Sequence, residues 1–410
     1  MGFDARAFTP ILVQRITIAG AETRSFKRAA IVVNEVGGQP VSAKSIERIV
    51  RDVGQELVQR RDVRPRSDEA LAKAPADAPD LAVVECDGGR IRTREPGHGP
   101  GVHRHETGWR ETKNACLIRA QRNRCGSDPH PDPPECFCNP RHVARIAETE
   151  ALSVAAPHGV VLTGPKEDPA DLPIQQDGSP KRLVRTVISS MARSKIFGRQ
   201  MQREAKRRRF FEAHAKAFLG DGLAWNWSIW KKQFPDFIPI LDFVHVLSYL
   251  FLAAKAVQEQ GEDAWNQYLV WMRGCWQGDI DQTLEELRAC QTRMGDPPAD
   301  CPDTDPRKIL ATTLRYLGNN RDRMKYPEYR EAGLPVTTAW MESLVKEINY
   351  RVKGTEMFWN DPEGAEAILQ IRAAALCDDG RLTEHLLHRP GCAFTRRRKP
   401  SSLPAGKIKS

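Results

Sequence analysis

Three carboxylates stand where a fold could bring them together. VVECDGG places Asp87 at the end of a β-rich apolar run, and AFLGDG places Asp221 at the end of another. A glycine follows each aspartate, so the backbone can turn at once where the strand leaves the core. Glu342 lies in WMESLVKEINYRVKGTEMFW, which has the apolar spacing of an amphipathic helix. Carboxylate oxygens from two strand ends and one helix are suitable ligands for Mg²⁺ or Mn²⁺.

Two such ions, about 4 Å apart, can activate a water or a 3′-hydroxyl and stabilise the leaving oxygen in phosphoryl transfer. We therefore predict Asp87, Asp221 and Glu342 as catalytic and metal-binding residues. Taken alone, each Asp-Gly pair is typical of a plain turn. Asp242, in LDFVH, also ends an expected strand and is the alternative second ligand. His245 is expected to orient a neighbouring carboxylate rather than to bind metal directly.

The helix that carries Glu342 has a polar row opposite its apolar stripe. Lys346 and Lys353 follow Glu342 on that row, and a solvated face with one Glu–Lys pair explains it without any ligand. Beside a metal site, the same lysines and Arg351 would hold DNA phosphates. Trp359 is expected either to stack on an unpaired base or, more simply, to anchor the core.

Basic residues exceed acidic ones, 62 Lys and Arg against 53 Asp and Glu, which gives a net charge of +9. This surplus suits a polyanionic partner, but it does not separate nucleic acid from a membrane surface. A basic helix is expected between about 193 and 211, where a solvated charged face is the alternative to a DNA-binding one. The residues expected to contact DNA there and near the closing helix are Arg203, Lys206, Arg207, Arg208, Arg321 and Arg323.

No apolar run approaches the roughly 20 residues of a membrane span. The N-terminal MGFDARAFTP lacks the features of a signal peptide, and the ten cysteines show no pairing rhythm. We therefore expect a cytoplasmic, nucleoid-associated protein with no membrane partner. The spacing of Cys125, Cys136, Cys138 and His142 is not that of the common zinc modules, so we expect a flexible loop with free thiols there.

The order of the expected elements predicts an α/β fold. Residues 1–60 are expected to be helical, and the helices around GGQP are compatible with a helix-turn-helix or with a plain helical hairpin. A Pro- and Ala-rich linker is expected at 61–80. The core then opens at 81–256 with LAVVECDGG, RIRTRE and NACLIRA as three strands of an antiparallel meander, before a structureless loop at 121–140.

The second half of the chain is expected to be mainly helical. Residues 257–332 show a helical pattern with breaks and no strand signal. The closing helix with Glu342 is expected within 333–380. The last segment, 381–410, is polar and basic and is expected to be a disordered tail.

Several blocks together resemble the DDE transposases of the Kra-type insertion-sequence family. They are LAVVECDGGRIRTRE with GWRETKN, LGDGLAWNW, LDFVH and NNRDRMKYPEYREAGLPVTTAWMESLVKEINYRVKGTEMFW, between about Phe8 and Leu382. The resemblance implies an RNase H-like mixed sheet flanked by helices, with an all-α insertion before the glutamate. It also implies cleavage of transposon ends with two Mg²⁺ or Mn²⁺ ions, and 3′-hydroxyl transfer into target DNA, by a homo-oligomer on double-stranded DNA.

Carried over to the matching positions, the resemblance implies Asp87, Asp221 and Glu342 as the catalytic triad. Family members usually have a Ser-Gly pair shortly before the glutamate, where this chain has Thr337, Thr338 and Ala339. Many members also begin with a longer region that contains CxxC pairs, and its lack would weaken recognition of transposon ends. The alternatives are an RNase H-like nuclease or Holliday-junction resolvase, and a non-catalytic DNA-binding relic.

Overall fold

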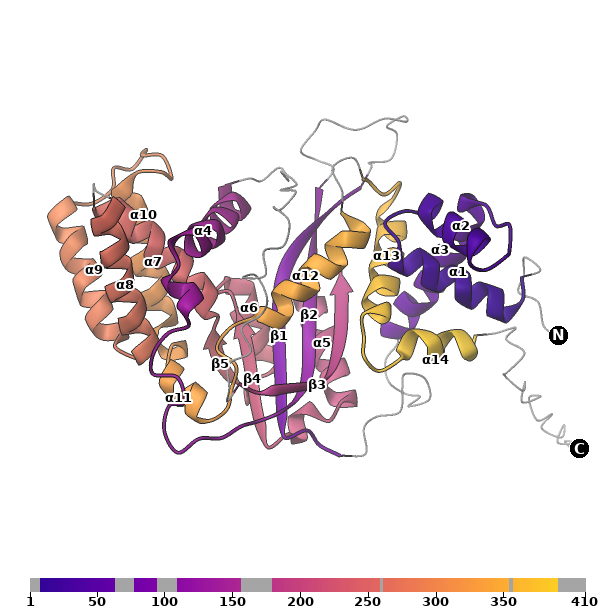
Figure 1. Cartoon of the computed structure of the whole chain (residues 1–410), viewed down its shortest axis with the longest axis horizontal. Coiled ribbons are helices and arrows are strands. Elements are labelled where there is room, and N and C mark those ends of the chain that lie inside the picture. The colour runs from indigo at the N-terminus through magenta and orange to yellow at the C-terminus, as the bar shows by residue number, and fades with distance from the viewer. Residues whose placement is uncertain are drawn as a thin grey trace, which may run out of the picture.

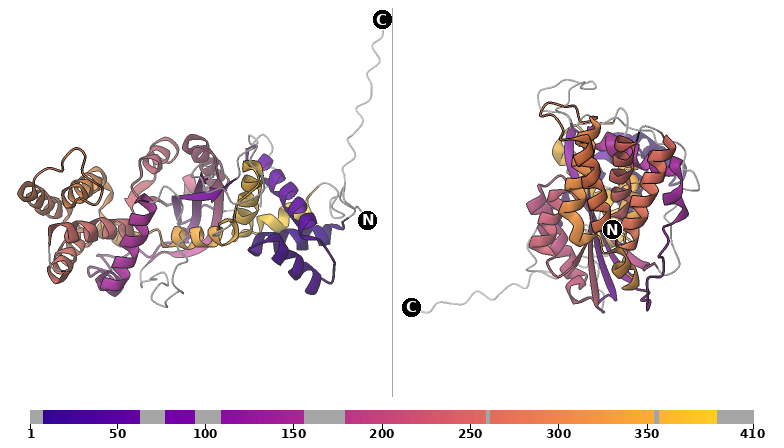
Figure 2. Two further views of the ribbon diagram at one scale, coloured as in Figure 1. Left: turned by 90° about the horizontal axis from the view of Figure 1, so that it is seen from above. Right: turned by 90° about the vertical axis from the view of Figure 1, so that its left-hand side faces the viewer.

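The molecule is elongated, with a central sheet between two groups of helices (Figures 1 and 2). The computed structural model describes residues 8–62, 77–93, 109–155, 179–258, 261–353 and 357–389. One helical group holds both the N-terminal and the C-terminal helices, and the other is formed by the middle of the chain. The fold is mixed α/β, as expected.

The central sheet has five strands in the order β3-β2-β1-β4-β5. Their bounds are β1 (Leu81–Arg92), β2 (Trp109–Gln121), β3 (Lys181–Ser190), β4 (Ala215–Gly220) and β5 (Ile238–Leu241). β1, β2 and β3 pair antiparallel, whereas β4 runs parallel to both β1 and β5. The sheet is therefore mixed, and β1 is the strand at which the direction of pairing changes.

Helices cover both faces of this sheet. Val83 on β1 packs in one core cluster with Leu344 of α12 (Ala339–Val352). Val84 points to the opposite face and packs in a second cluster with Phe197 of α5 (Ser194–Arg207) and Ile229 of α6 (Ala224–Gln233). Figure 1 shows α12 in front of the sheet and α5 behind it. Burial on both faces explains why the start of β1 is an unbroken apolar run and does not alternate.

The expected antiparallel meander is present, but with different strands. LAVVECDGG and the first three residues of RIRTRE form the single strand β1, because the strand continues through Gly88 and Gly89. A Cβ on Gly89 would lie 2.7 Å from Thr112 Oγ1, so the glycine permits a close strand pairing. The third strand is β3, which sequence analysis missed, since its last six residues are all buried and show no alternation.

The N-terminal region is helical, as expected, and forms α1 (Pro10–Glu22), α2 (Phe26–Glu35) and α3 (Ala43–Asp62). It packs against α13 (Pro362–Ala375), near the other end of the chain. A Cβ on Gly54 would lie 2.3 Å from Ala367 O, so α3 and α13 touch backbone to backbone. Of the expected linker, residues 63–76 lie outside the described residues.

Helix α7 (Phe243–Val257) follows β5 and ends where the helical insertion was expected to begin. The segment expected as the insertion, 257–332, contains α8 (Gly261–Gln277), α9 (Ile280–Met294), α10 (Pro306–Asn320) and α11 (Tyr326–Glu331), with a short 3₁₀ turn at Arg321–Arg323. Within the described part of the chain, no helix is long and apolar enough to span a bilayer. Helix α4 (Pro140–Ala155) packs on α7 and was not predicted.

Two segments expected to be structureless are ordered. In the loop at 121–140, Phe137 packs against Phe243 and Trp276, with ring centroids 5.7 Å and 5.9 Å away. The tail expected from residue 381 instead begins with α14 (Arg381–Leu387). Buried ion pairs of Arg381 dock this helix on α5. These corrections share a cause, because the partners of both segments lie far away in the sequence; residues 390–410 lie outside the described residues.

Candidate active site

Asp87 lies on β1, and Asp221 directly follows the neighbouring parallel strand β4. Glu85 on β1 pairs with Leu219 on β4, which is the last pair between these strands. The two aspartates each stand two residues beyond this pair, and neighbouring strands lie about 4.8 Å apart. Burial, followed by the charges of Asp221 and Asp87, raises the pKa of the Cys86 thiol between them well above its usual value.

Glu342 approaches the same region from α12. It is exposed in the first turn of that helix, which crosses β1 and β2 on the face that carries Glu85. The Glu85 side chain is completely buried, and neither of its carboxylate oxygens has a hydrogen-bond partner. Burial, then the charges of Asp242 and Glu342, raise the pKa of Glu85 well above its usual value. Acidic groups from β1, α7 and α12 therefore gather above this end of the parallel strands.

Local hydrogen bonds orient the two aspartates. Asp87 Oδ1 accepts from the N–H of Gly88 at 2.6 Å. Asp221 Oδ1 accepts from Leu223 N at 2.9 Å and from Asn226 Nδ2 at 2.5 Å. The following glycine, Gly222, has φ = +95°, a conformation that favours glycine. Asp221-Gly222 is thus a tight turn directly after β4, whereas Asp87-Gly88 lies inside β1 and not at the strand end expected from the sequence.

The helical insertion also positions Asp221. The hydroxyl of Tyr316, on α10, donates to the backbone oxygen of Asp221 at 2.8 Å. A Cβ on Gly222 would lie 2.4 Å from the Tyr316 ring, so the two groups are in close contact. An element inserted later in the chain thereby supports the second aspartate.

Asp242 is fully buried and acts as a structural connection. Its Oδ1 caps α7 through Val244 N at 3.2 Å and accepts from Thr338 N at 3.0 Å. Its Oδ2 accepts from Thr338 Oγ1 at 2.8 Å and lies 2.6 Å from His245 Nδ1. These bonds favour a positioning role over direct metal binding. Thr338 stands at the N-cap of α12, but its hydroxyl bonds to Asp242 and makes no capping hydrogen bond to the helix.

The donor chemistry of Asp87, Asp221 and Glu342, with buried Glu85 behind them, fits Mg²⁺ or Mn²⁺, which bind oxygen ligands. In the described residues, no group of three or more His, Cys, Asp or Glu side chains lies close enough together to hold a metal ion. Cys125, Cys136 and Cys138 are free and partly exposed.

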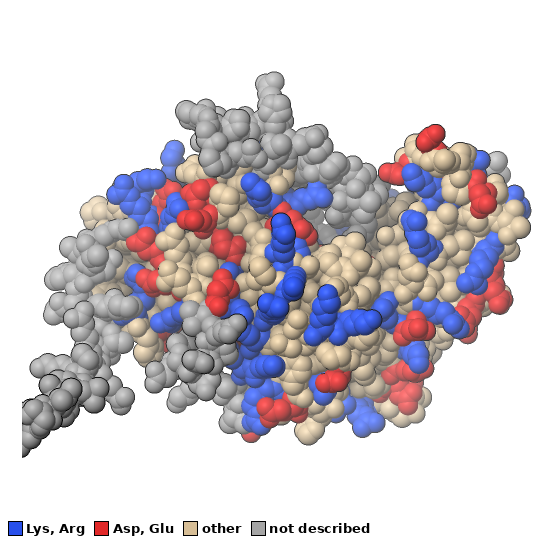
Figure 3. Space-filling view, turned by 180° about the vertical axis from the view of Figure 1, so that it is seen from behind, with Lys and Arg blue, Asp and Glu red and all other residues tan. Residues whose placement is uncertain are grey.

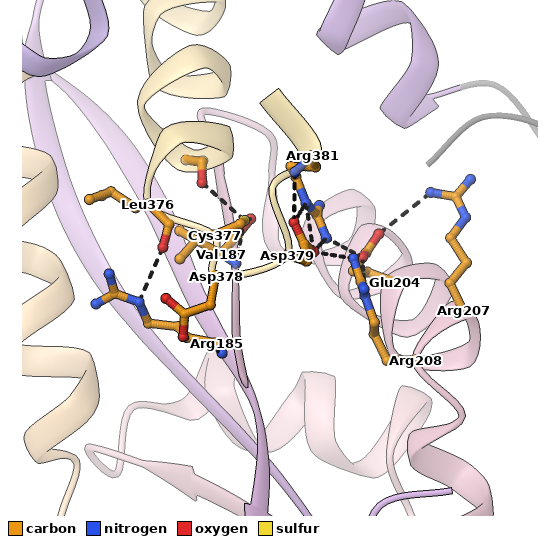
Figure 4. Close-up of polar contacts among 11 residues, drawn as sticks. Arg185, Val187, Glu204, Arg207, Arg208, Leu376, Cys377, Asp378, Asp379 and Arg381 are labelled. Atoms are coloured by element: carbon orange, nitrogen blue, oxygen red, sulfur yellow. Dashed lines mark hydrogen bonds and ion pairs between the residues drawn. The ribbon is translucent and has the colours of Figure 1, made fainter. Parts of the chain in front are cut away.

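The predicted DNA contacts on α5 have diverse environments. Lys206 is exposed. Arg203 donates to the backbone oxygen of Arg61 at 3.0 Å, and Arg207 lies 3.5 Å from Glu204. Arg208 is only 7 % exposed and pairs with Glu204 at 3.0 Å and with Asp379 (Figure 4). Contrary to the expectation for a DNA contact, Arg208 connects elements inside the protein.

Basic residues other than Arg208 are exposed on this side of the molecule. Figure 3 shows Lys and Arg gathered over the middle of the face behind the sheet, which α5 and α6 cover. The exposed basic residues on these two helices are Lys195, Arg199, Lys206, Lys231 and Lys232. Neither Lys231 nor Lys232 was predicted to contact DNA, although they form a basic pair in WNWSIWKKQF.

The basic residues near the closing helix also differ in their exposure and contacts. Lys346 is exposed, whereas Lys353 is half-buried, with its ammonium 5.9 Å from the Trp109 ring centroid. Arg321 forms an ion pair with Asp281. The guanidinium of Arg323 lies 4.4 Å from the centroid of Trp227 on α6. This contact joins the insertion to the helix that directly follows Asp221.

Arg351 is buried and Trp359 is half-buried. Arg351 is only 1 % exposed, which differs from the surface position expected of a DNA contact. Trp359 Nε1 donates to Val352 O at 3.1 Å, and Trp359 N donates to Arg92 O at 2.8 Å. A parallel bridge also pairs Trp359 with Thr93. Trp359 therefore anchors the end of α12 to β1, the simpler of its two expected roles.

The aromatic residues near Asp221 were not predicted from the sequence. Trp225 and Trp227 are partly buried on α6, within two turns of Asp221. The ammonium of Lys113, which is itself buried and paired with Glu111, lies 5.4 Å from the Trp225 ring centroid. The repeat in AWNWSIW was the available signal.

Comparison with known proteins adds no family to this description. No protein-family model matches the chain. No curated protein matches it either. Membership of the Kra-type transposase family therefore stays a prediction from the sequence blocks.

Proposed function

We propose that the protein is a DDE-type DNA transposase with an RNase H-like core, which cleaves transposon ends and transfers the 3′-hydroxyl into target DNA. The observation that carries the proposal is that Asp87 lies on β1 and Asp221 directly follows the adjacent parallel strand β4, near a helix with Glu342 in its first turn. The mixed sheet and the helical insertion before α12 agree with the architecture that the sequence resemblance implies.

Each part of the site has a role in this chemistry. Asp87, Asp221 and Glu342 would hold two Mg²⁺ or Mn²⁺ ions, which supply an activated nucleophile and stabilise the leaving oxygen. Asp242 holds Thr338 and so fixes the start of the helix that carries Glu342. The exposed cations of α5 and α6 would follow the backbone of double-stranded DNA, which gives position without sequence specificity.

A strand-transfer assay tests the proposal. The full chain is incubated with duplexes that carry the DNA flanking its gene, a supercoiled plasmid, and Mg²⁺ or Mn²⁺. Asp87→Asn, Asp221→Asn and Glu342→Gln should each reduce joined products by at least ~100-fold, because a metal ligand contributes several kcal/mol to such a barrier. Asp296→Asn and Glu285→Gln are matched controls, since both residues are exposed and distant from the sheet.

The products separate this proposal from its alternatives. Nicked plasmid without joined products, lost in the same variants, would favour an RNase H-like nuclease or resolvase. DNA binding without any metal-dependent product would favour a non-catalytic relic. If Asp221→Asn stayed active while a stably folded Asp242→Asn did not, the assignment of the second aspartate would be wrong. Sedimentation of the DNA complex tests for the expected homo-oligomer.

A further inference from the structure

A cavity of about 240 Å³ lies at the far end of α12 from Glu342. The first turn of α2, the middle of α3 and the segment from Met357 to Asp361 line it. Its size is sufficient for several water molecules or a phosphate group. Arg351, the last arginine of α12, lines the cavity from the inside.

Arg351 carries a buried charge that the protein does not neutralise. Its Nε donates to Gly20 O at 2.7 Å, but Nη2 has no hydrogen-bond partner. The guanidinium lies between two rings, 4.7 Å from the centroid of Phe26 and 5.3 Å from that of Trp359. In the described part of the chain no carboxylate forms an ion pair with it, and burial and then Arg372 lower its pKa to about 10. An unpaired buried charge costs several kcal/mol.

The other charged residues of the cavity wall balance one another in number, Arg24 and Arg51 against Glu47 and Asp361. The two acidic residues already have cationic partners: Asp361 binds Arg51 through two hydrogen bonds of 2.9 Å and 3.0 Å, and Glu47 binds Lys44 at 2.9 Å. Arg24 is exposed at the wall, with its guanidinium 4.6 Å from the Tyr350 ring centroid. Ser25 and Phe26, at the start of the ten-residue helix α2, also line the cavity. The N-terminus of a helix favours anions.

We propose that this cavity binds a phosphate group of a DNA strand, with Arg24 as a direct donor and the buried guanidinium of Arg351 as the positive charge that favours the anion. Exposed Lys27 and Arg28 on α2 extend the positive surface beyond the cavity, which suits a polyanion better than an isolated small ion.

The distance between Glu342 and Arg351 along α12 can be compared with the spacing of phosphates on a DNA strand. Glu342 and Arg351 are nine positions apart on α12, which is about 14 Å at 1.5 Å per residue. A DNA strand carries one phosphate per ~3.4 Å of helix axis, so a strand that ran along α12 would have its bound phosphate about four nucleotides from the reacting one. The choice of DNA as the source of the phosphate rests on the proposed function, whereas the anion site itself does not.

The first experiment uses inorganic phosphate as the probe. Thermal unfolding of the full chain is followed in sodium phosphate and in sodium chloride of equal ionic strength, because a ligand that binds only the folded state raises its melting temperature. We expect phosphate to raise the melting temperature of the wild type and of Arg288→Met, a control at an exposed arginine on α9. The shift should be absent in Arg351→Met and reduced in Arg24→Gln. Equal shifts in all four proteins would overturn the anion site.

The second experiment measures DNA affinity against salt concentration. Loss of one phosphate contact lowers the slope of log K against log[salt] by about 1, so Arg351→Met should show this decrease on any duplex sequence. If Arg351→Met abolishes the phosphate shift but leaves the DNA slope unchanged, the assignment to DNA is overturned. Arg24→Gln repeats both tests at an exposed position, where folding is not at risk.

Neither readout requires catalysis. Glu342→Gln should retain the phosphate shift and the wild-type salt slope. If Glu342→Gln also retained strand transfer, the proposed function would fail while the anion site stood. If strand transfer depended on Glu342 but no variant changed phosphate or DNA binding, the anion site would fail and the proposed function would stand.

Discussion

Two groups of buried arginines in this molecule have opposite surroundings. Arg208 and Arg381 converge on Glu204 and Asp379, and each guanidinium has carboxylate partners (Figure 4). Arg351 is buried more deeply, at 1 % exposure, yet its contacts are a backbone oxygen and two aromatic rings. Burial alone therefore does not identify the role of an arginine, whereas the presence or absence of carboxylate partners does.

The difference distinguishes arginines with a structural role from an arginine with a proposed ligand-binding role. The Glu204 group joins α5 to α14, and its charges compensate one another within the protein. Around Arg351 the compensation is incomplete, so an anion from outside would recover a cost that folding leaves in place. The comparison leads to three stability predictions.

The largest effect is expected for Glu204→Gln. This change leaves Arg208 and Arg381 with one carboxylate partner fewer in a buried group, and breaking such a pair costs about 3 kcal/mol or more. The free energy of unfolding in urea measures the loss. The control is Glu212→Gln, which removes an exposed pair with Arg209 and should leave the urea midpoint unchanged. A small loss for Glu204→Gln would show that Asp379 alone compensates both arginines.

The same group predicts a loss of stability in acid. Burial would raise the pKa of Glu204, but the Arg381 and Arg208 charges outweigh it and lower the pKa from 4.5 to about 2. The stabilisation is therefore complete above pH 4.5 and is lost as the pH falls towards 2, in total about 3 kcal/mol. Urea unfolding at a series of pH values should show a shallower decline for Glu204→Gln than for the wild type. Parallel profiles would contradict the assignment to Glu204.

The smallest effect is expected for Arg351→Met without any anion present. The variant loses the bond to Gly20 and the contacts with two rings, but it also removes an uncompensated buried charge. These terms oppose each other, so the free energy of unfolding should change by less than ~1 kcal/mol. Urea unfolding in a phosphate-free buffer measures it. A loss as large as that of Glu204→Gln would show that Arg351 is structural and that the two groups do not differ.

Local patterns predicted the elements that place the carboxylates. The apolar runs before Asp87 and Asp221 form β1 and β4, and the periodic stretch around Glu342 forms α12. The sequence could not show that β1 and β4 are adjacent and in matching register, because pairing depends on the whole sheet. It could equally not separate Lys206, which is exposed, from Arg208, which is buried. The partner Asp379 lies 171 residues from Arg208.

Hydrogen bonds fix both ends of α12. Thr338 binds Asp242 at one end, and at the other Trp359 binds both Val352 and Arg92. Between these ends, Glu347 binds Arg185 through two hydrogen bonds of 3.1 Å and 2.9 Å, and Arg351 binds Gly20 O at 2.7 Å. A helix held at both ends and along its length can neither tilt nor roll without breaking these bonds. The position of Glu342 is therefore set by residues from most of the chain, from Gly20 to Trp359.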